Sequence, residues 1–435
     1  MERIEGEWIV GFKLRDDIIE PANVPERSGS RNNGGALEEL GGRCVGRRGQ
    51  GATPASAARA KPGKRDPTWR LCYQPQGCGS LMKGLMNNGQ MTDDRRVREV
   101  GEFGLIELLA EGLPAEVRAA SDLQLGIGDD AAVWQPTPGE LIVVTTDSLV
   151  ESVHFRRDWT DWESLGHKAL AVNVSDLAAM GAIPKLAVIS LGLDGEERIG
   201  DLQALYSGLG GLARRLHMTI AGGDIVRSPR GLILHVTAIG ETSGQRVLTR
   251  SGANSGDLIG VTGTLGASAA GLHLLGLETD DARRRAATAN LLIEAHLRPE
   301  PRVALGAALL ELGATSAMDL SDGLLGDLPK ILAASGVGAR LDEESIPVAA
   351  AVRALYPDEW VDLALRGGED YELLFTAPRR AWDAIDRAAR EAGGTVTAIG
   401  EVVERGPVPT NIELVGRDGA RRTVVAGAYD HFDHA

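Results

Sequence analysis

The chain has 435 residues, of which 43% are hydrophobic and 25% are charged, and its formal net charge is −15. This composition is typical of a globular protein and excludes a chain that is disordered throughout. No apolar run is long enough to cross a membrane, no signal-peptide core follows Met1, and all three cysteines precede residue 80, so we expect a cytoplasmic protein without structural disulfides.

The charge is unevenly distributed along the chain. Residues 95–435 hold 32 Lys and Arg against 49 Asp and Glu. Nucleic-acid binding requires a basic face, so this balance argues against a nucleic-acid partner. Anionic substrates remain possible if metal cations neutralise the charge between them and the protein.

Residues 1–95 are rich in Gly, Arg, Asn and Ser and show no sustained helical or strand period. We expect this segment to be a disordered extension. Met82, Met86 and Met91 stand just before the first amphipathic pattern, so the segment is either an over-extended reading frame or a genuine unstructured arm.

A first mixed domain is expected over residues 96–248. Phe103, Ile106, Leu109 and Leu113 recur at helical spacing and predict a short helix that ends near Pro114. Alternating apolar segments then predict strands over 141–144, 186–191, 218–221 and 232–240, and helices over 162–180 and 202–216.

A second mixed domain is expected over residues 249–435, after a polar, glycine-rich stretch near 250–257. The pattern predicts strands over 258–262, 315–320, 371–376 and 395–402, and helices over 267–277, 302–312 and 324–334. The alternation of strands and helices in both halves predicts a two-domain chain of the α/β, or mixed α+β, class.

Five short segments place aspartate beside Gly, Ser or Thr, mostly where a strand is expected to end or a helix to begin. They are Gly126-Ile127-Gly128-Asp129-Asp130, Thr145-Thr146-Asp147, Ser175-Asp176, Gly222-Gly223-Asp224 and Asp319-Leu320-Ser321-Asp322-Gly323. A single such segment is explained by a turn or a helix cap, for which Asp is favoured. Five in one chain indicate a shared site.

Carboxylate and hydroxyl oxygens are the ligands that Mg²⁺ prefers, together with substrate phosphates and water. Several aspartates that converge on magnesium ions could therefore hold nucleotide phosphates without basic side chains. The chain has neither a G-x-x-x-x-G-K-[ST] loop nor the protein-kinase motifs. The glycine-rich run 261–266 could present N–H groups to an anion, but a tight strand-to-helix turn needs the same glycines, and we favour that structural interpretation.

These segments resemble the thiamine-monophosphate kinase family, in family order over residues 99–432. The matching stretches are L-G-I-G-D-D-A-A (125–132), T-T-D-S-L-V-E-S-V-H-F (145–155), A-V-N-V-S-D-L-A-A-M-G-A (171–182), A-G-G-D (221–224), L-T-R-S-G-A (248–253), D-L-S-D-G-L (319–324), G-G-E-D-Y-E-L (367–373) and Y-D-H-F (429–432). The resemblance implies a two-domain aminoimidazole ribonucleotide synthetase-like fold, with the N-terminal domains paired through their sheets into a homodimer.

The resemblance also implies roles for individual residues. The magnesium positions, for several ions, are Asp130, Thr145, Thr146, Asp147, Asp176, Asp224, Asp319 and Asp322. The nucleotide contacts are Gly223, Asp224, Arg250 and Ser321, and the thiamine contacts are His154, Glu369 and Tyr429. From the sequence alone, a surface arginine is the favoured interpretation of Arg250 and a structural histidine that of His154, while Tyr429 could equally be a core tyrosine.

The implied activity is magnesium-dependent, direct in-line transfer of the ATP γ-phosphoryl group to thiamine monophosphate. The acceptor phosphate is already largely dianionic near neutral pH, so no strong general base is needed. The alternatives are another ATP-dependent enzyme of the same fold, such as an aminoimidazole ribonucleotide synthetase, and a non-catalytic nucleotide sensor.

Overall fold

The structure is a computed structural model that describes residues 93–406 and 412–424, all within one compact unit, Gly84–Ala435. Most of the expected N-terminal extension and the expected thiamine contact Tyr429 therefore lie outside the described residues. In the described part, no helix is long and apolar enough to cross a membrane.

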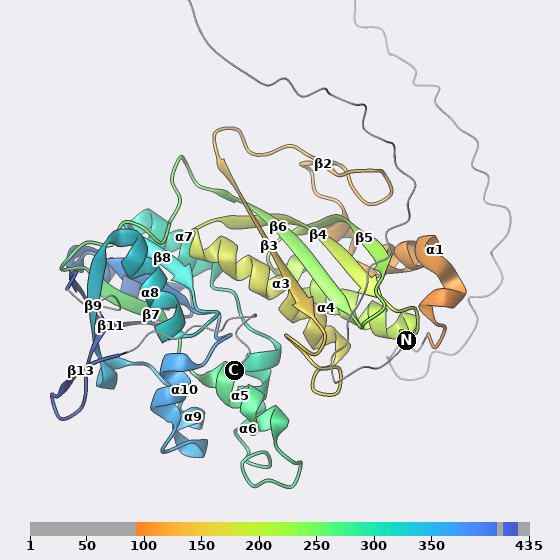
Figure 1. The fold of residues 1–435 in the computed structure, drawn as a ribbon. Helices are drawn as coiled ribbons and strands as arrows, with labels where there is room; N and C mark the ends of the chain where they lie inside the picture. Colours follow the sequence, from red (N-terminus) through yellow and green to blue (C-terminus); the bar gives the residue numbers. More distant parts are fainter. Residues whose placement is uncertain (1–92, 407–411, 425–435) are drawn as a thin grey trace, which may run out of the picture. The chain divides into compact units, whose positions relative to one another are not determined.

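The first half contains a four-stranded sheet and its helices (Figure 1). Its elements are α1 (Val97–Gly112), α2 (Ala115–Arg118), β1 (Leu123–Leu125), β2 (Val133–Trp134), β3 (Leu141–Val150), α3 (Trp162–Ala179), β4 (Ile183–Leu193), α4 (Ile199–Arg215), β5 (Thr219–Arg227) and β6 (Ile233–Thr242). The sheet order is β3-β6-β4-β5, with β4 and β5 parallel and the other neighbours antiparallel. The strands β1 and β2 form a separate two-stranded sheet.

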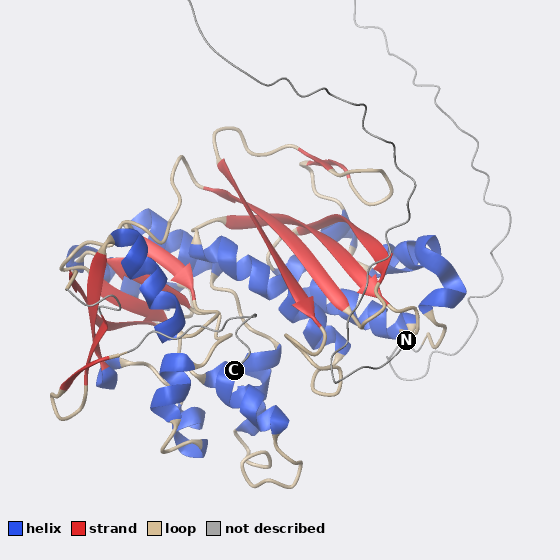
Figure 2. Cartoon of the chain, in the orientation of Figure 1, coloured by secondary structure: helices blue, strands red, loops and turns tan. Residues whose placement is uncertain are grey.

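Helices α3 and α4 cover one face of this sheet (Figure 2). Fifteen of the eighteen residues of α3 are buried, because the helix packs on the sheet, on α4 and on elements of the second half. The helices α3 and α4 approach closely through two glycines. A Cβ on Gly166 would lie 1.9 Å from the Leu205 carbonyl oxygen, and one on Gly208 would lie 1.9 Å from the Glu163 carbonyl oxygen.

The second half is built on a seven-stranded sheet of order β13-β12-β9-β11-β7-β10-β8. All neighbours are antiparallel except β12 and β9. Its elements are β7 (Leu258–Thr262), α5 (Ala267–Gly276), α6 (Ala289–Leu297), α7 (Val303–Leu312), β8 (Ser316–Asp319), α8 (Leu324–Ser335), β9 (Val337–Asp342), η1 (Glu343–Ser345), α9 (Ala350–Leu355), α10 (Trp360–Arg366), β10 (Leu373–Ala377), η2 (Arg379–Ala381), α11 (Trp382–Glu391), β11 (Val396–Glu404), β12 (Ile412–Val415) and β13 (Arg421–Thr423).

The two halves share a packed junction at the C-terminal end of α3. Ala178 and Ala179 belong to one buried apolar cluster with Leu305, Leu309 and Leu310 of α7. A Cβ on Gly306 would lie 1.9 Å from the Ala178 carbonyl oxygen, so the two helices touch backbone to backbone. This contact places the end of α3, including Asp176, beside the start of the second half.

The predicted strands and helices are present, but some of their boundaries were wrong. Strand β3 continues through Thr145, Thr146 and Asp147 to Val150 instead of ending there, and β5 continues through Asp224 to Arg227. Both extensions pair with a neighbouring strand along their whole length, and this long-range pairing outweighs the local turn preference of Asp and Gly.

The predicted apolar face of the first helix was also partly wrong. Leu109 and Leu113 are buried as expected, but Phe103 is 82% exposed and Leu105 takes the buried position against the core. Gly101 has φ 72° and interrupts α1, and beyond it Leu105, Leu109 and Leu113 recur every fourth residue.

Candidate active site

A cavity of about 1050 Å³ lies where α3 meets the loops of the second half. It has an acidic end and an apolar end. The acidic end is lined by Asp147, Asp176, Asp319 and Asp322, with Ser321 and Arg250. The apolar end is lined by Phe155, Trp159, Leu165, Leu272, Leu275 and Leu297.

Three different elements supply the acidic end. Asp147 comes from the edge strand β3, Asp176 from the last turns of α3, and Asp319 from the end of β8. Thr145 donates a hydrogen bond to Asp176 at 2.5 Å, and Ser175 donates one to Asp319 at 2.7 Å. The second bond joins the two halves of the chain, because Ser175 lies on α3 and Asp319 on the seven-stranded sheet.

Burial raises the pKa of three carboxyl groups at this end, those of Asp147, Asp176 and Asp319. Burial raises the pKa of Asp319 to about 7, and the nearby Asp176 adds to the effect. The pKa values of Asp147 and Asp176 are also raised, by burial in both and by Asp176 in the case of Asp147, while Arg250 and Thr145 oppose the change at Asp176. A set of oxygen ligands that repel one another is chemically suited to a hard divalent cation.

The loop 320–323 is fixed by a buried aspartate that the sequence analysis did not single out. Asp327 accepts hydrogen bonds from the backbone N–H groups of Ser321 and Asp322, at 3.0 and 2.9 Å. Lys330 bridges this aspartate to the loop, donating to Asp322 at 2.6 Å and to Asp327 at 2.8 Å. The orientation of Asp322 is therefore set from within α8.

A second loop, Gly367 to Tyr371, interlocks with the first. The N–H of Glu369 donates to the Ser321 carbonyl oxygen, and that of Tyr371 donates to the Leu320 carbonyl oxygen. Glu369 and Tyr371 have φ values of 63° and 51°, in the left-handed region that non-glycine residues rarely adopt. Strained backbone of this kind persists where the surrounding structure determines it, and it clusters at functional sites.

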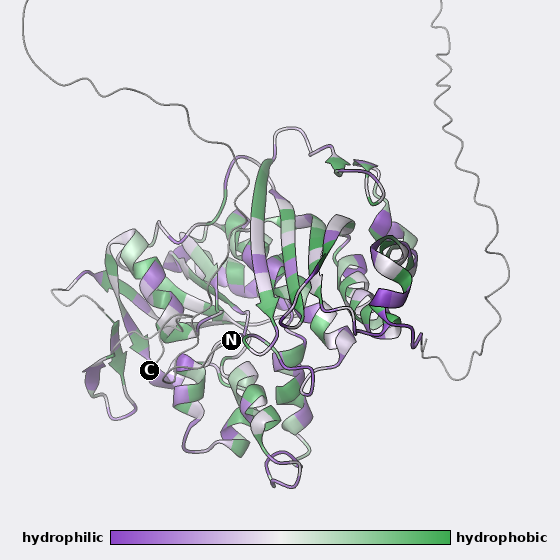
Figure 3. Ribbon diagram, turned by 45° about the vertical axis from the view of Figure 1, so that its right-hand side comes forward, coloured by the Kyte–Doolittle hydropathy of each residue, from purple (hydrophilic) through white to green (hydrophobic). Residues whose placement is uncertain are grey.

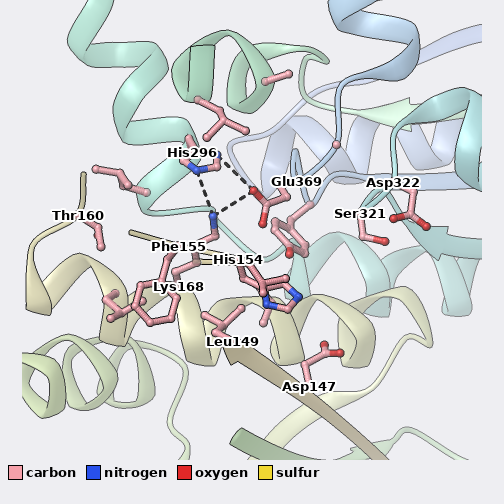
Figure 4. A pocket seen from close by; sticks show the side chains of 18 of the residues that line it. Asp147, Leu149, His154, Phe155, Thr160, Lys168, His296, Ser321, Asp322 and Glu369 are labelled. Carbon is pink, nitrogen blue, oxygen red and sulfur yellow. Dashed lines mark hydrogen bonds and ion pairs between the residues drawn. The ribbon is translucent and has the colours of Figure 1, made fainter. Parts of the chain in front are cut away.

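Between the two ends lies a polar cluster of Lys168, His296 and Glu369 (Figure 4). Lys168 Nζ is 3.2 Å from Glu369 Oε2 and 3.5 Å from His296 Nε2, and His296 Nδ1 is 3.0 Å from Ser268 Oγ. Burial and the Lys168 charge lower the pKa of His296 to about 4, so its imidazole is neutral near pH 7.

The remaining sequence-predicted residues divide into those at the cavity and those away from it. His154 lines the cavity, and its Nδ1 accepts a hydrogen bond from the Val150 N–H at 3.1 Å. Asp130 does not line the cavity; its N–H bonds to the Asp129 carboxylate in an exposed loop. Thr145 acts through Asp176, to which it donates its hydroxyl hydrogen.

Thr146 and Asp224 lie on the other face of the four-stranded sheet. Side chains alternate between the faces of a strand, so Thr146 points away from its neighbours Thr145 and Asp147, and it bonds Thr237 and His235. Asp224 pairs with Ser190 on β4, and Ser190 pairs with His235 on β6. Gly223 and Asp224 are on β5, three strands from β3, a separation of roughly 14 Å.

In the described part of the chain, no three His, Cys, Asp or Glu side chains are close enough to hold a metal ion by themselves. This finding does not conflict with the donor set. Magnesium commonly takes one or two carboxylates and completes its shell with water and substrate phosphates. The acidic end offers such carboxylates around open space.

The glycine-rich turn at 261–266 is structural. The N–H groups of Gly266 and Ser268, at the start of α5, donate to the Asp370 carboxylate at 2.7 and 3.1 Å. A Cβ on Gly263 would lie 1.9 Å from Glu372 Oε1. The N-terminus of α5 is thus already capped by a side chain of the protein itself, the carboxyl group of Asp370.

Sequence reasoning missed Lys168, His296 and Tyr371, all of which line the cavity. A signal for Lys168 existed: it is four residues before Val172 and eight before Asp176, on one face of an otherwise buried helix. Tyr371 also had a signal, because it lies in the stretch G-G-E-D-Y-E-L (367–373), two residues after Glu369. His296 carries no comparable signal, because helix packing brings it to the cavity.

Comparison with known proteins agrees with this architecture. Residues 128–242 match the family described as AIR synthase related protein, N-terminal domain, and residues 254–409 match AIR synthase related protein, C-terminal domain. A thiamine-monophosphate kinase of Escherichia coli (strain K12) is 41% identical over 338 residues, which cover 76% of this chain and 98% of that protein.

Solved structures give the same result. The crystal structure of thiamine-monophosphate kinase from Stenotrophomonas maltophilia K279a is 39% identical, with a TM-score of 0.65, over 75% of this chain and 98% of the other. A structure described as AaThiL complexed with AMPPCP and TMP is 33% identical, with a TM-score of 0.60, over 78% and 99%. The aspartate segments, the two-sheet architecture and these similarities agree: the chain belongs to the thiamine-monophosphate kinase family.

Proposed function

We propose that this chain catalyses transfer of the γ-phosphoryl group of ATP to the phosphate of thiamine monophosphate, giving thiamine diphosphate and ADP. One observation carries the proposal: a single cavity joins an acidic end to an apolar, aromatic end. The acidic end suits metal-bound phosphates, and the apolar end suits a heterocycle. The family similarity supports the same pair of substrates.

The acidic end is the proposed magnesium site, with Asp147, Asp176, Asp319 and Asp322 as the residues that would hold the ions. Magnesium bound there would neutralise charge on the phosphates. Arg250 lines the same end, and its guanidinium can pair with a phosphate oxygen. Ser321 is proposed to contact the nucleotide from the loop that Asp327 holds in place.

Positioning accounts for the chemistry. The acceptor phosphate is largely dianionic near neutral pH and is itself a competent nucleophile, so the chain has to orient it and limit water around it. The proposed thiamine contacts His154 and Glu369 line the same cavity as the acidic and apolar residues. We propose direct in-line transfer, which predicts inversion of configuration at a γ-phosphorus made chiral with oxygen isotopes.

The decisive experiment is an assay of ATP-dependent turnover with three candidate acceptors: thiamine monophosphate, thiamine and an aminoimidazole precursor. We expect thiamine diphosphate and ADP from thiamine monophosphate, and very slow reaction of thiamine, whose alcohol lacks the metal-bound phosphate anchor. Turnover of the aminoimidazole precursor would show that the chain has another activity known for the same fold. Nucleotide binding without turnover of any acceptor would show that the chain is a nucleotide sensor.

We also propose that two copies pair through the open face of the four-stranded sheet, opposite α3 and α4. Ile142, Val144 and Val226 on this face are 51, 59 and 51% exposed. In Figure 3 the strands of this sheet carry green, hydrophobic stretches. An exposed apolar face bounded by the edge strand β3 is a surface that proteins usually cover.

A further inference from the structure

Lys168 is the most deeply buried cation at the cavity. Its side chain is 3% exposed, and it projects from α3, an otherwise largely apolar helix. A buried ammonium is strongly destabilising unless a carboxylate and further hydrogen bonds compensate it. Here the compensation comes from the second half of the chain, through Glu369 at 3.2 Å and His296 at 3.5 Å.

The donors and acceptors of this cluster fix the state of His296. A lysine ammonium can only donate, so Nε2 of His296 must accept and Nδ1 must carry the hydrogen. That hydrogen is directed to Ser268 Oγ at 3.0 Å, and Glu369 Oε2 lies 3.4 Å from the same nitrogen. The neutral imidazole thus links the ammonium to α5 and lies against the carboxylate.

The cluster leaves one carboxylate oxygen of Glu369 for the cavity. The Lys168 and His296 contacts both fall on Oε2, while the other oxygen faces the interior of the cavity (Figure 4). The backbone of Glu369 is in the left-handed region and its N–H is bonded to the Ser321 carbonyl oxygen. Both the main chain and the side chain of Glu369 are therefore held in one orientation.

A fixed carboxylate at this place favours one part of the acceptor over the other. It repels a phosphate group, which is proposed to bind instead at the acidic end through magnesium ions. It attracts the heterocyclic part of thiamine monophosphate, which carries a cationic thiazolium ring and an aminopyrimidine with N–H donors. The neighbouring apolar side chains Leu272, Leu275 and Leu297 suit the same rings.

We propose that Lys168 and His296 are positioning residues that hold Glu369 as the recognition group for the heterocycle of the acceptor. The inference rests on the proposed function, since it names how that acceptor is selected. Neither residue needs to touch the substrate. Their effect passes through the carboxylate that they orient.

The test is the Lys168→Met variant, assayed with ATP and thiamine monophosphate varied separately. Loss of a charge-assisted hydrogen bond should raise the KM for thiamine monophosphate about 10- to 100-fold, with the KM for ATP nearly unchanged. In a Glu369→Gln background, the same substitution should have little further effect, because its target is gone.

A matched control is Lys185→Met. Lys185 Nζ lies 3.2 Å from Glu241 Oε2, the same pair at the same distance, but away from the cavity. The Lys185→Met variant should leave the KM for ATP and the KM for thiamine monophosphate unchanged. If thermal melting shows that Lys168→Met does not fold, a comparison of His296→Leu with His296→Gln tests the same network. The Gln side chain keeps a hydrogen-bond donor and a hydrogen-bond acceptor, so His296→Gln should retain most of the affinity for thiamine monophosphate.

Three results would overturn the inference: equal rises in both KM values, an undiminished effect of Lys168→Met in the Glu369→Gln background, or a KM for thiamine monophosphate that does not change. The first two would make Lys168 a structural residue. Failure of the proposed function is separate, since it would appear as absence of thiamine monophosphate turnover in the unmodified chain.

Discussion

Asp147 and Asp322 come to the acidic end from different halves of the chain, and they differ in how they are held. Asp147 projects from a strand, whereas Asp322 is paired with Lys330 at 2.6 Å. Each would supply a charge-bearing oxygen to a phosphate-bound cation. Under the proposed function, their contribution would be preorganised charge at the reacting phosphates.

Asp147→Asn and Asp322→Asn should each reduce turnover at least ~100-fold at limiting magnesium, the effect expected on removing one preorganised electrostatic group. Thermal melting should show that the fold survives, because removing one of several mutually repelling carboxylates does not weaken packing. Asp386→Asn, in an exposed pair with Arg390 on α11, is the control and should be as active as the unmodified chain. Normal turnover of both site variants would show that the two aspartates have only a structural role, in a turn or a strand.

Asp370 gives a stability prediction that does not depend on the substrates. Burial raises its pKa to about 7, although the N–H groups of Gly266 and Ser268 favour the charged form. An aspartate in the unfolded chain titrates near 3.9. Between these values the folded chain holds a proton that the unfolded chain has released, so the free energy of unfolding should fall as the pH rises toward 7.

The comparison to make is the unmodified chain against Asp370→Asn, by urea denaturation from pH 5 to pH 8. The advantage of the unmodified chain should be largest at pH 5 and should shrink as the pH rises through 7. An advantage that grows with pH would mean that the start of α5 holds Asp370 as an anion, and that its pKa is not raised.

At the residue scale, the sequence predicted the acidic end better than the rest of the site. The local motifs around Asp147, Asp176, Asp319 and Asp322 are enough to nominate them, and the structure places all four around one cavity. Lys168 and His296 could not be nominated in this way, because their roles depend on contacts between segments 128 residues apart. The expected roles of Asp130, Gly223 and Asp224 stay predictions.

At the scale of elements, α3 is the central support of the cavity. It carries Lys168 and Asp176 on one face and packs against α4 through glycines on another. The apolar periodicity predicted this helix almost to its ends. It could not predict that β3 and β5 run on through their Asp segments, because cross-strand pairing decides where a strand ends.

Two glycines on α4 provide a direct test of this packing. Gly208→Ala would place a Cβ 1.9 Å from the Glu163 carbonyl oxygen and force α3 and α4 apart, whereas a Cβ on Gly211 meets nothing within 4 Å. Gly208→Ala should lower the free energy of unfolding by about 1–3 kcal/mol. Gly211→Ala should be neutral or raise it by up to about 1 kcal/mol.

Urea denaturation of the two variants under one set of conditions gives both values, provided that the slope against urea stays constant. Because α3 positions the cavity, Gly208→Ala should also weaken turnover, and Gly211→Ala should not. Equal stability of the two variants would show that α3 and α4 are not packed through Gly208.

At the scale of the whole molecule, the active site depends on contacts between the two halves. The Ser175–Asp319 hydrogen bond and the Lys168–Glu369 ion pair each join an α3 residue to a loop or strand of the second half. A sequence can indicate that both halves are mixed α and β, but not which surfaces meet. The domain boundary between residues 248 and 249 stays a prediction.

The open face of the four-stranded sheet gives the last prediction, which concerns the proposed homodimer. Strand β3 is an edge strand of this sheet. Its residues Ile142 and Val144 expose apolar side chains on the face that α3 and α4 do not cover. If two copies pair there, Val144→Glu buries an unpaired charge in the interface and should produce monomers in sedimentation velocity at micromolar concentration. Phe103→Glu changes an even more exposed apolar residue, on α1, and should leave the dimer intact. A monomeric unmodified chain would overturn the proposed pairing. Dissociation by Phe103→Glu alone would place the interface away from this sheet.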